Sequence, residues 1–347
     1  MKRGAVTTNV ADDPRLDPRL RAFLALVPIS PPRSVANRDE LMAIAATPEA
    51  IAAEEFSRAM AEICDDESVA PSTGLRFQTY DVTSSPDANT IKIQFVRPDT
   101  EEVLPCVYYI HGGAMMWSSS FNGNYRALAR IIAAKGVAVA MVEFRNAMMP
   151  SGVAEVAPFP GGLNDCLSGL RWVHEHAREL GVEPTRVVVS GESGGGNLAL
   201  ATGLALKRSG ELLLVRGIYA LCPFLTVEHN ASFSSYAEND GIFISLGGNV
   251  AVVGYGIEAF ESKNPLAWPL FASEEDLRGL PPTVISVNEC DPLRDQGIEF
   301  YRRLLAAGVA ARGRNVLGTM HGTEAAVILC PEITHDAARD LAAFAYQ

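Results

Sequence analysis

Residues 186–199 read RVVVSGESGGGNLA, and this stretch decides the expected fold. Its apolar start predicts a buried strand, and its end begins a helix-forming run. Between them, residues 191–195 fit the pattern G-x-S-x-G, which places Ser193 on a sharp turn between strand and helix. Small neighbours let strand and helix approach there, and the helix N-terminus favours developing negative charge. The stretch therefore predicts a strand–turn–helix unit with Ser193 as nucleophile.

A second pattern overlaps the first. Residues 194–199 satisfy G-x-G-x-x-A, a loose form of the dinucleotide-binding fingerprint. That fingerprint normally belongs to an opening βαβ unit, whereas several expected strands precede this one. We interpret the match as fortuitous, and a nicotinamide-dependent oxidoreductase remains only as a weakly supported alternative.

Strands and helices alternate on both sides of this unit. Near-continuous apolar runs predict strands covered on both faces, at 107–110, 137–142, 186–189, 215–221 and 283–287. Helical stretches fall between them, at 125–135, 163–180, 197–208 and 296–307. Two runs with alternating apolar residues, 76–82 and 90–96, predict an antiparallel edge. The pattern predicts an α/β fold with a mostly parallel sheet of about eight strands flanked by helices.

Two segments break this rhythm. The first 74 residues contain Ala-rich and Glu-rich stretches at helical spacing and are predicted to form an N-terminal helical cap. Residues 226–275 are long, irregular and glycine-rich, which is typical of an inserted cap or lid. The expected core consists of 75–225 and 276–347.

A serine nucleophile needs a base, and on such a sheet the order is Ser, Asp/Glu, His. His321 follows Ser193 and lies in a loop between an apparent strand and the last helix, so we predict it to be the base. The remaining histidines lie upstream of Ser193, in the insertion or in the final helical stretch: His111, His174, His176, His229 and His335.

The acid that orients the base should follow the strand at 283–288. Asp291 is the preferred residue, because Pro292 favours an extended conformation before it. Glu289 and Asp295 are alternatives, although Asp295 fits better as a cap of the following helix. The acid would hold the imidazole tautomer and stabilise the imidazolium.

The run YYIHGGA at 108–114 follows another expected strand. Without side chains at Gly112 and Gly113, consecutive backbone amides can converge on one point. With the amide of Gly194 they are predicted to form an oxyanion hole, although His-Gly-Gly can also be a plain tight turn. His111 is expected to support the loop.

Three large apolar residues come directly after this loop. Met115, Met116 and Trp117 are predicted to line an apolar acyl or alcohol pocket. Ordinary core packing is an alternative interpretation for all three.

Composition excludes several classes of function. The formal charge of −12 disfavours nucleic acid as a partner. Six cysteines are scattered without metal-ligand or disulfide spacing, so free thiols and no metal or organic cofactor are expected. No secretory signal and no run of 18 apolar residues is present, which predicts a cytoplasmic protein without a membrane span. A homodimer is left open.

Together, HGG, GESGGGN, DPLRD and the later His-Gly resemble the hormone-sensitive-lipase group of α/β-hydrolases, from about residue 75 to the C-terminus. Phe159-Pro160 followed by Asp165-Cys166 matches a further stretch of that group. Segments at 142–147, 238–241 and 264–273 are similar to one member that opens a macrolactone.

The resemblance implies a serine carboxylic-ester hydrolase for short to medium acyl esters or lactones, with a helical cap over the acyl pocket. Ala114 replaces the third glycine of the usual HGGG, and Glu192 and Gly195 alter the usual elbow, which puts the substrate in doubt but not the chemistry. A non-catalytic small-molecule receptor on the same fold is the alternative, but such receptors tend to lose the histidine.

Overall fold

The computed structural model of the chain describes residues 13–27, 32–228, 230 and 232–347. Eight strands among them form one sheet in the order β1-β2-β4-β3-β5-β6-β7-β8. β2 is antiparallel to both β1 and β4, and every pair from β4 to β8 is parallel. The strands are β1 (Leu75–Thr83), β2 (Thr90–Pro98), β3 (Leu104–Ile110), β4 (Ala138–Glu143), β5 (Val182–Glu192), β6 (Gly217–Leu221), β7 (Thr283–Asn288) and β8 (Ala311–Val316).

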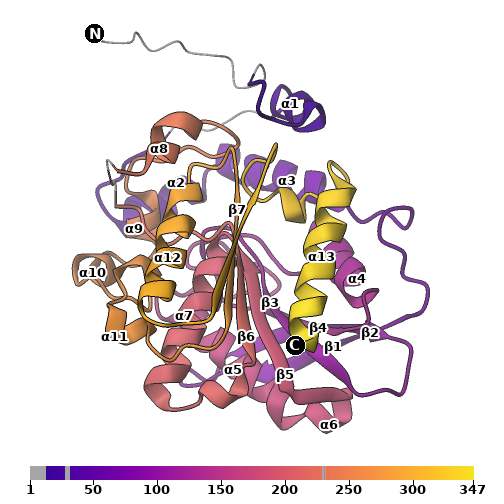
Figure 1. Cartoon of the computed structure of the whole chain (residues 1–347). Coiled ribbons are helices and arrows are strands. Elements are labelled where there is room, and N and C mark those ends of the chain that lie inside the picture. Colours follow the sequence, from indigo (N-terminus) through magenta and orange to yellow (C-terminus); the bar gives the residue numbers. More distant parts are fainter. Residues whose placement is uncertain (1–12, 28–31, 229, 231) are drawn as a thin grey trace.

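Helices cover both faces of this sheet (Figure 1). α4 (Gly123–Ala133) and α13 (Pro331–Tyr346) pack on one face, and α5 (Gly161–Glu175), α7 (Gly194–Ser209) and α12 (Arg294–Ala306) pack on the other. The strands between them are apolar because both faces are covered; every residue of β3, β4, β6 and β7 is buried. The predicted α/β architecture with a mostly parallel sheet is confirmed.

Two local features differ from the prediction. The helix expected at 163–180 is divided at His176 into α5 and α6 (Ala177–Leu180), and the His176 ring bonds the carbonyl of Trp172 in the last turn of α5. The helix after the nucleophile begins at Gly194 rather than at 197. Glycine is a poor helix former, so the three glycines conceal the true start of the helix.

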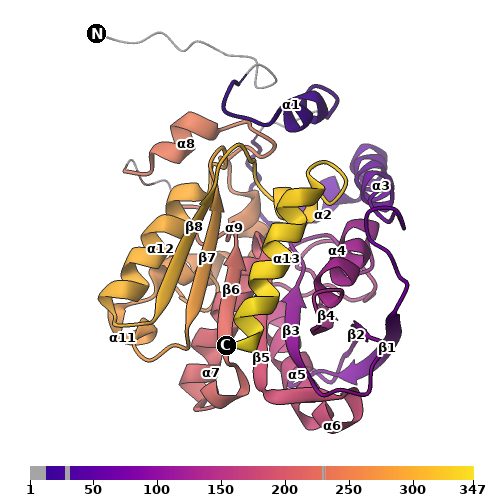
Figure 2. The same cartoon turned by 45° about the vertical axis from the view of Figure 1, so that its right-hand side comes forward.

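The N-terminal segment forms three helices: α1 (Pro18–Leu24), α2 (Arg38–Ala45) and α3 (Pro48–Glu62). A polar side chain caps each of them by accepting a backbone amide of the first turn, namely Asp17, Asn37 and Thr47. The helices gather at one end of the sheet together with α8 (Figures 1 and 2). This end also carries the site described below.

The insertion contains α8 (Ser234–Asn239), α9 (Val250–Tyr255), α10 (Ile257–Glu261), the 3-10 helix η3 (Pro269–Phe271) and α11 (Glu274–Leu277). It joins the N-terminal segment directly. The side-chain amide of Asn249 accepts from the backbone N–H of Val35 and donates to its carbonyl, both at 2.8 Å, and Arg38 donates to the carbonyl of Gly254 at 2.6 Å. The two segments predicted as cap therefore form one assembly.

Helix α1 lies against the loop before His321. Leu16, Leu20 and Leu24 form a small buried cluster with Met320 and other apolar residues. The N–H of Asp17 also donates to the carbonyl of Gly318 at 2.9 Å. Within the described ranges, no helix combines the length and apolar character needed to cross a membrane.

Candidate active site

Ser193 lies on a strained turn between β5 and α7. Its φ of 55° and ψ of −117° are rare for a residue with a side chain, and such a conformation costs about 1–3 kcal/mol. The surrounding backbone is packed so closely that a Cβ on Gly191 would lie 2.4 Å from the carbonyl oxygen of Gly195. This geometry is the predicted elbow, which lifts the serine hydroxyl clear of the strand.

The same packing accounts for the glycines that resemble a dinucleotide fingerprint. A Cβ on Gly195 would lie 2.0 Å from the carbonyl oxygen of Ile110, and one on Gly196 would lie 3.0 Å from that of Leu221. Close approach of α7 to β3 and β6 therefore requires small residues here. No phosphate ligand is needed to explain them.

Residues 193, 291 and 321 meet at the end of the sheet. The Nε2 atom of His321 lies 2.8 Å from the Oγ of Ser193, and its Nδ1 atom lies 2.8 Å from the Oδ2 of Asp291. Ser193 and His321 are 9% and 6% exposed, and Asp291 is fully buried. The three side chains thus form one hydrogen-bonded chain that reaches the surface only at the serine end.

The Asp291 carboxylate is held from its other side. Its Oδ1 accepts the backbone N–H of Leu293 at 2.8 Å, which leaves Oδ2 for the imidazole. The two alternative acids are engaged elsewhere: Glu289 accepts the amide of Gly318 at 2.8 Å, and Asp295 accepts the amide of Ser235 at 2.9 Å. Only Asp291 among the three contacts His321.

The loop that carries His321 is fixed by a buried amide. The Nδ2 atom of Asn288, the last residue of β7, donates to the carbonyl of Met320 at 2.6 Å and to Oε2 of Glu324 at 3.0 Å. The Thr323 hydroxyl donates to the same carbonyl at 2.8 Å. Residues on both sides of the imidazole are thereby tied to the sheet.

The surroundings of His321 act on its pKa in opposite directions. Burial is the largest single influence and lowers the pKa, but the Asp291 carboxylate and Cys222 together raise it by more, so the pKa stands well above its ordinary value. Burial of Glu324 raises the pKa of that carboxyl, and the nearby Glu192 and Asp291 carboxylates add to the effect.

The predicted oxyanion loop differs from expectation at one amide. The N–H of Gly112 donates to the phenolic oxygen of Tyr125 at 2.8 Å, and the Tyr125 hydroxyl in turn donates to Oε1 of Glu192. Since this bond occupies the single amide hydrogen of Gly112, Gly112 does not fit the predicted role as oxyanion donor. It instead anchors the loop to α4 and to the residue before the nucleophile.

The next amides are the ones that face the elbow. A Cβ on Gly194 would lie 2.7 Å from the amide nitrogen of Ala114, so this nitrogen lies beside the start of α7. Among the described residues no acceptor binds the amides of Gly113 and Ala114, and Gly194 opens a helix whose first amides lack intrahelical partners. Gly113 and Ala114 have φ values of +101° and +51°, so the loop passes through left-handed backbone conformations beside the start of α7.

His111 lies behind the loop rather than in it. Its ring stacks on Phe144 with centroids 4.3 Å apart, and its Nδ1 lies 2.8 Å from the carbonyl oxygen of Gly112. Glu143 supports the same loop, accepting the hydroxyl of Ser119 at 2.8 Å and the amide of Ser120 at 2.6 Å. His111 is placed where a supporting residue is expected.

The three residues after the loop do not share one environment. Met115 and Met116 are buried in the main core, and Met116 packs against Gly254 of α9. Trp117 is half-buried at the border of the same core. Core packing therefore describes the two methionines, and Trp117 is the more accessible of the set.

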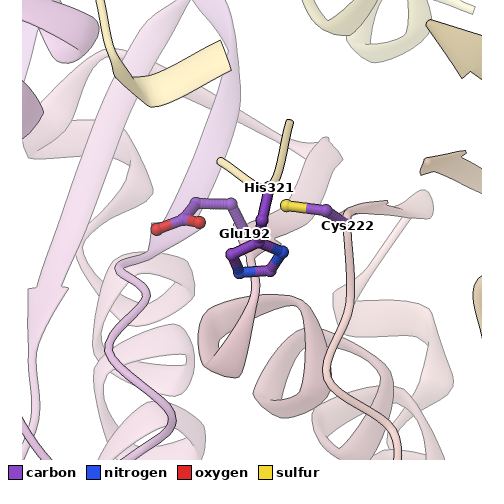
Figure 3. A group of neighbouring side chains, drawn as sticks. All are labelled: Glu192, Cys222 and His321. Atoms are coloured by element: carbon purple, nitrogen blue, oxygen red, sulfur yellow. The ribbon is translucent and has the colours of Figure 1, made fainter. Parts of the chain in front are cut away.

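Sequence reasoning missed two neighbours of the imidazole. Cys222 follows β6, Glu192 ends β5, and both side chains reach His321 from different directions (Figure 3). One potential ligand atom from each of these three residues lies within 4.8 Å of the others. Sequence offers little signal for Cys222, because it belongs to no motif, whereas Glu192 was visible as the variable position of G-x-S-x-G. Of the other histidines, His229 lies outside the described residues.

Comparison with known proteins agrees with this geometry. The profile of the α/β hydrolase fold matches residues 107–325. The carboxylesterase NlhH of Mycobacterium tuberculosis is 32% identical over 251 residues, which cover 71% of this chain and 75% of that protein. The chain belongs to the α/β-hydrolase family.

Solved structures narrow the class. Esterase Est22 superposes with a TM-score of 0.94 and 53% identity, over 97% of this chain and 99% of that one. Brefeldin A esterase, described as a bacterial homologue of human hormone-sensitive lipase, superposes with a TM-score of 0.84 and 36% identity, over 96% and 94% of the two chains. The chain is an esterase of this family, and the resemblance to the hormone-sensitive-lipase group is confirmed.

Proposed function

We propose that this esterase hydrolyses carboxylic esters through an acyl-enzyme, with Ser193 as nucleophile, His321 as general base and Asp291 as the acid that orients the base. The observation that carries the proposal is the continuous hydrogen-bonded chain from Asp291 through His321 to Ser193, with both contacts at 2.8 Å. It is the arrangement that a serine needs in order to lose its proton during attack.

The reaction runs in two halves. Nε2 of His321 takes the hydroxyl proton while Oγ of Ser193 bonds to the ester carbonyl carbon, and the proton then passes to the departing alcohol oxygen. Water next gives a proton to Nε2 and attacks the acyl-enzyme, and the proton returns to Ser193 as the acid leaves. The Asp291 carboxylate stabilises the imidazolium in both halves and keeps its own charge.

The oxyanion is assigned to the amides of Gly113, Ala114 and Gly194. The unpaired amides of the first two and the position of the third at the start of α7 support this set. Donors in such a site contribute about 2.7–4 kcal/mol each to lowering the barrier. Gly112 acts indirectly, because its bond to Tyr125 fixes the loop that carries the other two.

Short to medium acyl esters or lactones are the proposed substrates. The similarity to a carboxylesterase and to brefeldin A esterase supports this class, and a macrolactone of the latter type is one candidate. The joined cap of α2 and α9 is proposed to cover the acyl pocket, with Trp117 at its wall. A homodimer and a cytoplasmic location remain predictions from the sequence.

The intact proton relay argues against a non-catalytic receptor, which would have no use for it. The decisive experiment compares the wild type with Ser193→Ala on p-nitrophenyl acetate, butyrate and octanoate. Since Est22 has been solved with p-nitrophenol, the same alcohol is a reasonable probe. Loss of a triad nucleophile costs roughly 10⁶-fold in kcat, so the variant should fall to background.

Ser190→Ala is the matched control. Ser190 lies three residues earlier in β5, is fully buried, and its hydroxyl has no hydrogen-bond partner in the described structure. This control should keep most of the activity. A phosphonate ester inhibitor should add its mass to the peptide that contains Ser193, and labelling elsewhere or equal activity of both variants would refute the nucleophile.

A chain-length series tests the pocket. Trp117→Ala should shift the preference between butyrate and octanoate, since removal of a half-buried aromatic side chain opens apolar volume. An unchanged ratio would remove Trp117 from the pocket, and a lactone panel would then decide between ester and lactone substrates.

A further inference from the structure

Two chemically different ligand groups lie beside the imidazole of His321, and the proposed reaction uses neither of them as an acid, base or nucleophile. Cys222 supplies a thiol and Glu192 a carboxylate, each with one ligand atom within 4.8 Å of the others (Figure 3). All three are buried: Cys222 is fully buried, and Glu192 and His321 are 6% exposed. Glu192 is the residue before Ser193 in the chain, and Nε2 of His321 lies 2.8 Å from the Ser193 hydroxyl.

Each group has an electron pair to give. Tyr125 occupies Oε1 of Glu192, whereas no described residue donates a hydrogen bond to Oε2. Oε2 faces the His321 loop, since a Cβ on Gly322 would lie 3.6 Å from it. The Nδ1–H of His321 serves Asp291, so the lone pair of the neutral ring is on Nε2.

We propose that Cys222, His321 and Glu192 form a binding site for a soft divalent cation of the Zn²⁺ and Cd²⁺ class, which switches the esterase off. Zinc binds thiolate at about 2.3 Å and imidazole nitrogen or carboxylate oxygen at about 2.0–2.2 Å. Ligand atoms bound to zinc at these lengths lie about 3–4 Å apart, which is closer than the 4.8 Å limit within which the three atoms lie here, so coordination requires small movements of the side chains. Thiolate ligands select zinc, cadmium and similar ions over magnesium or calcium.

Charge and proton balance favour this ion. Thiolate and carboxylate together carry two negative charges, which neutralise a dication in a buried place. Burial raises the pKa of Cys222 to about 12, although the neighbouring His321 lowers it somewhat, so the free enzyme carries the thiol. Coordination deprotonates a thiol outright and needs the unprotonated imidazole, so binding releases protons to solvent and weakens as the pH falls.

Binding and inhibition are separable claims. A cation on Nε2 takes the lone pair that would accept the Ser193 proton, so turnover stops; this consequence rests on the proposed function. Binding of the metal does not rest on the proposed function, because none of the three ligands depends on Ser193 acting as nucleophile. A chelator should restore the activity, since no covalent bond to carbon is formed.

A second cluster in the chain provides the matched control. Asp17, Cys330 and Glu332 also place potential ligand atoms within 4.8 Å of one another. Both carboxylates there already pair with Arg19, and Glu332 is largely exposed. A cation would have to displace a guanidinium, so this cluster should bind weakly.

The binding experiment uses the inactive variant Ser193→Ala, which keeps all three ligands. Cadmium titrated into it should bind once. Calorimetry in two buffers should show release of protons, and ultraviolet absorption should appear from thiolate-to-cadmium charge transfer. Adding Cys222→Ala should weaken binding by more than about 100-fold, because even substitutions outside the ligand shell cost roughly 10–100-fold. Adding Cys330→Ala should change nothing, and magnesium should not bind.

The activity experiment follows inhibition by Zn²⁺ relative to each variant's own metal-free rate. The inhibition constant should rise by a similar factor in Cys222→Ala, stay unchanged in Cys330→Ala, and rise more modestly in Glu192→Gln. Cadmium binding to Ser193→Ala that persists without Cys222 would overturn the proposed site. Binding that depends on Cys222 without any inhibition would leave the site standing and refute the proposed role of His321.

Discussion

Two helices of almost equal length, one after Ser193 and one in the N-terminal segment, differ sharply in how deeply they are buried. Helix α7, which follows Ser193, has 16 residues, of which 12 are buried. Helix α3 of the N-terminal segment has 15 residues, and none is buried; Ile51 and Phe56 on the helix and Ile63 directly after it are exposed. Burial of α7 therefore contributes much more to the stability of the fold than burial of α3 does. Segments with little buried area are those that open most easily.

The largest loss of activity should come from a substitution among the buried residues next to Ser193. Asp291→Asn keeps the size of the side chain but removes the charge that stabilises the imidazolium and fixes its tautomer. The kcat on p-nitrophenyl butyrate should fall by about 10⁴-fold. Assays with long incubation times measure this loss after the rate of spontaneous ester hydrolysis is subtracted.

Glu289→Gln is the control for that substitution. Glu289 lies two residues earlier and accepts the Gly318 amide, which a glutamine oxygen can also accept. Its kcat should stay within a few-fold of the wild type. If both variants lost activity equally, Asp291 would not be the orienting acid.

Tyr125→Phe should have the next largest effect, because it removes the link between the oxyanion loop and Glu192. The buried Gly112 amide and the Glu192 carboxylate would both lose a partner, which costs about 1–3 kcal/mol of stability. We expect kcat to fall by about 10-fold to 100-fold, less than for a donor removed outright. Steady-state kinetics and thermal unfolding measure the two effects.

Tyr255→Phe is the paired control in the cap. The Tyr255 hydroxyl is buried without a hydrogen-bond partner in the described structure, so its removal leaves no other group unpaired. Kinetics and stability should stay close to the wild type. Equal losses in the two variants would mean that the Tyr125 bonds have no special part in holding the loop.

Activity and stability should respond to pH in opposite directions at the triad. Because the pKa of His321 is raised, kcat/KM should fall about tenfold per pH unit below that pKa, as the base becomes protonated. The same raised pKa contributes to the free energy of unfolding. The contribution is complete at pH values below the pKa of His321 in the unfolded chain, and it is lost as the pH rises through the pKa of His321 in the folded protein. In Asp291→Asn the kinetic midpoint should move to lower pH; an unmoved midpoint would assign the transition to another group.

The smallest change in stability should come from a substitution on helix α3. Phe56→Ser on α3 exchanges an exposed ring, and the free energy of unfolding should change by no more than about 0.5 kcal/mol. Phe300→Ala in α12 removes a fully buried ring and should cost about 3–5 kcal/mol. Urea unfolding of both variants checks the contrast, and comparable losses would show that α3 is as firmly packed as the core.

The sequence was most informative where chemistry follows chain order. Strand periodicity predicts the sheet, and the order Ser, Asp/Glu, His points to Ser193 and His321, which contact each other across 128 residues of chain. Chain order alone leaves Glu289, Asp291 and Asp295 as candidate acids, and the preference for Asp291 depends on Pro292. The sequence was least informative where a backbone turns. The course of the oxyanion loop depends on left-handed φ values that the residue types do not dictate, since Ala114 takes such a conformation without being glycine.

Contacts between residues of different motifs could not be predicted from the sequence either. Tyr125 meets Gly112 and Glu192 because α4 packs against the sheet at β2 and β4, and Cys222 meets His321 because β6 lies between β5 and β7. Such neighbours are set by the order of strands in the sheet, which differs from their order in the chain.

The pairing of Asn249 with Val35 has a consequence for how the protein is made. These residues are 214 positions apart, so the first helices leave the ribosome long before their partner is synthesised. During that interval the apolar side of α2 has nothing to rest on, and the nascent chain must tolerate it or be shielded by a chaperone. The assembly of the N-terminal helices with the insertion is thus completed late in synthesis, after the turn at Ser193 has been made.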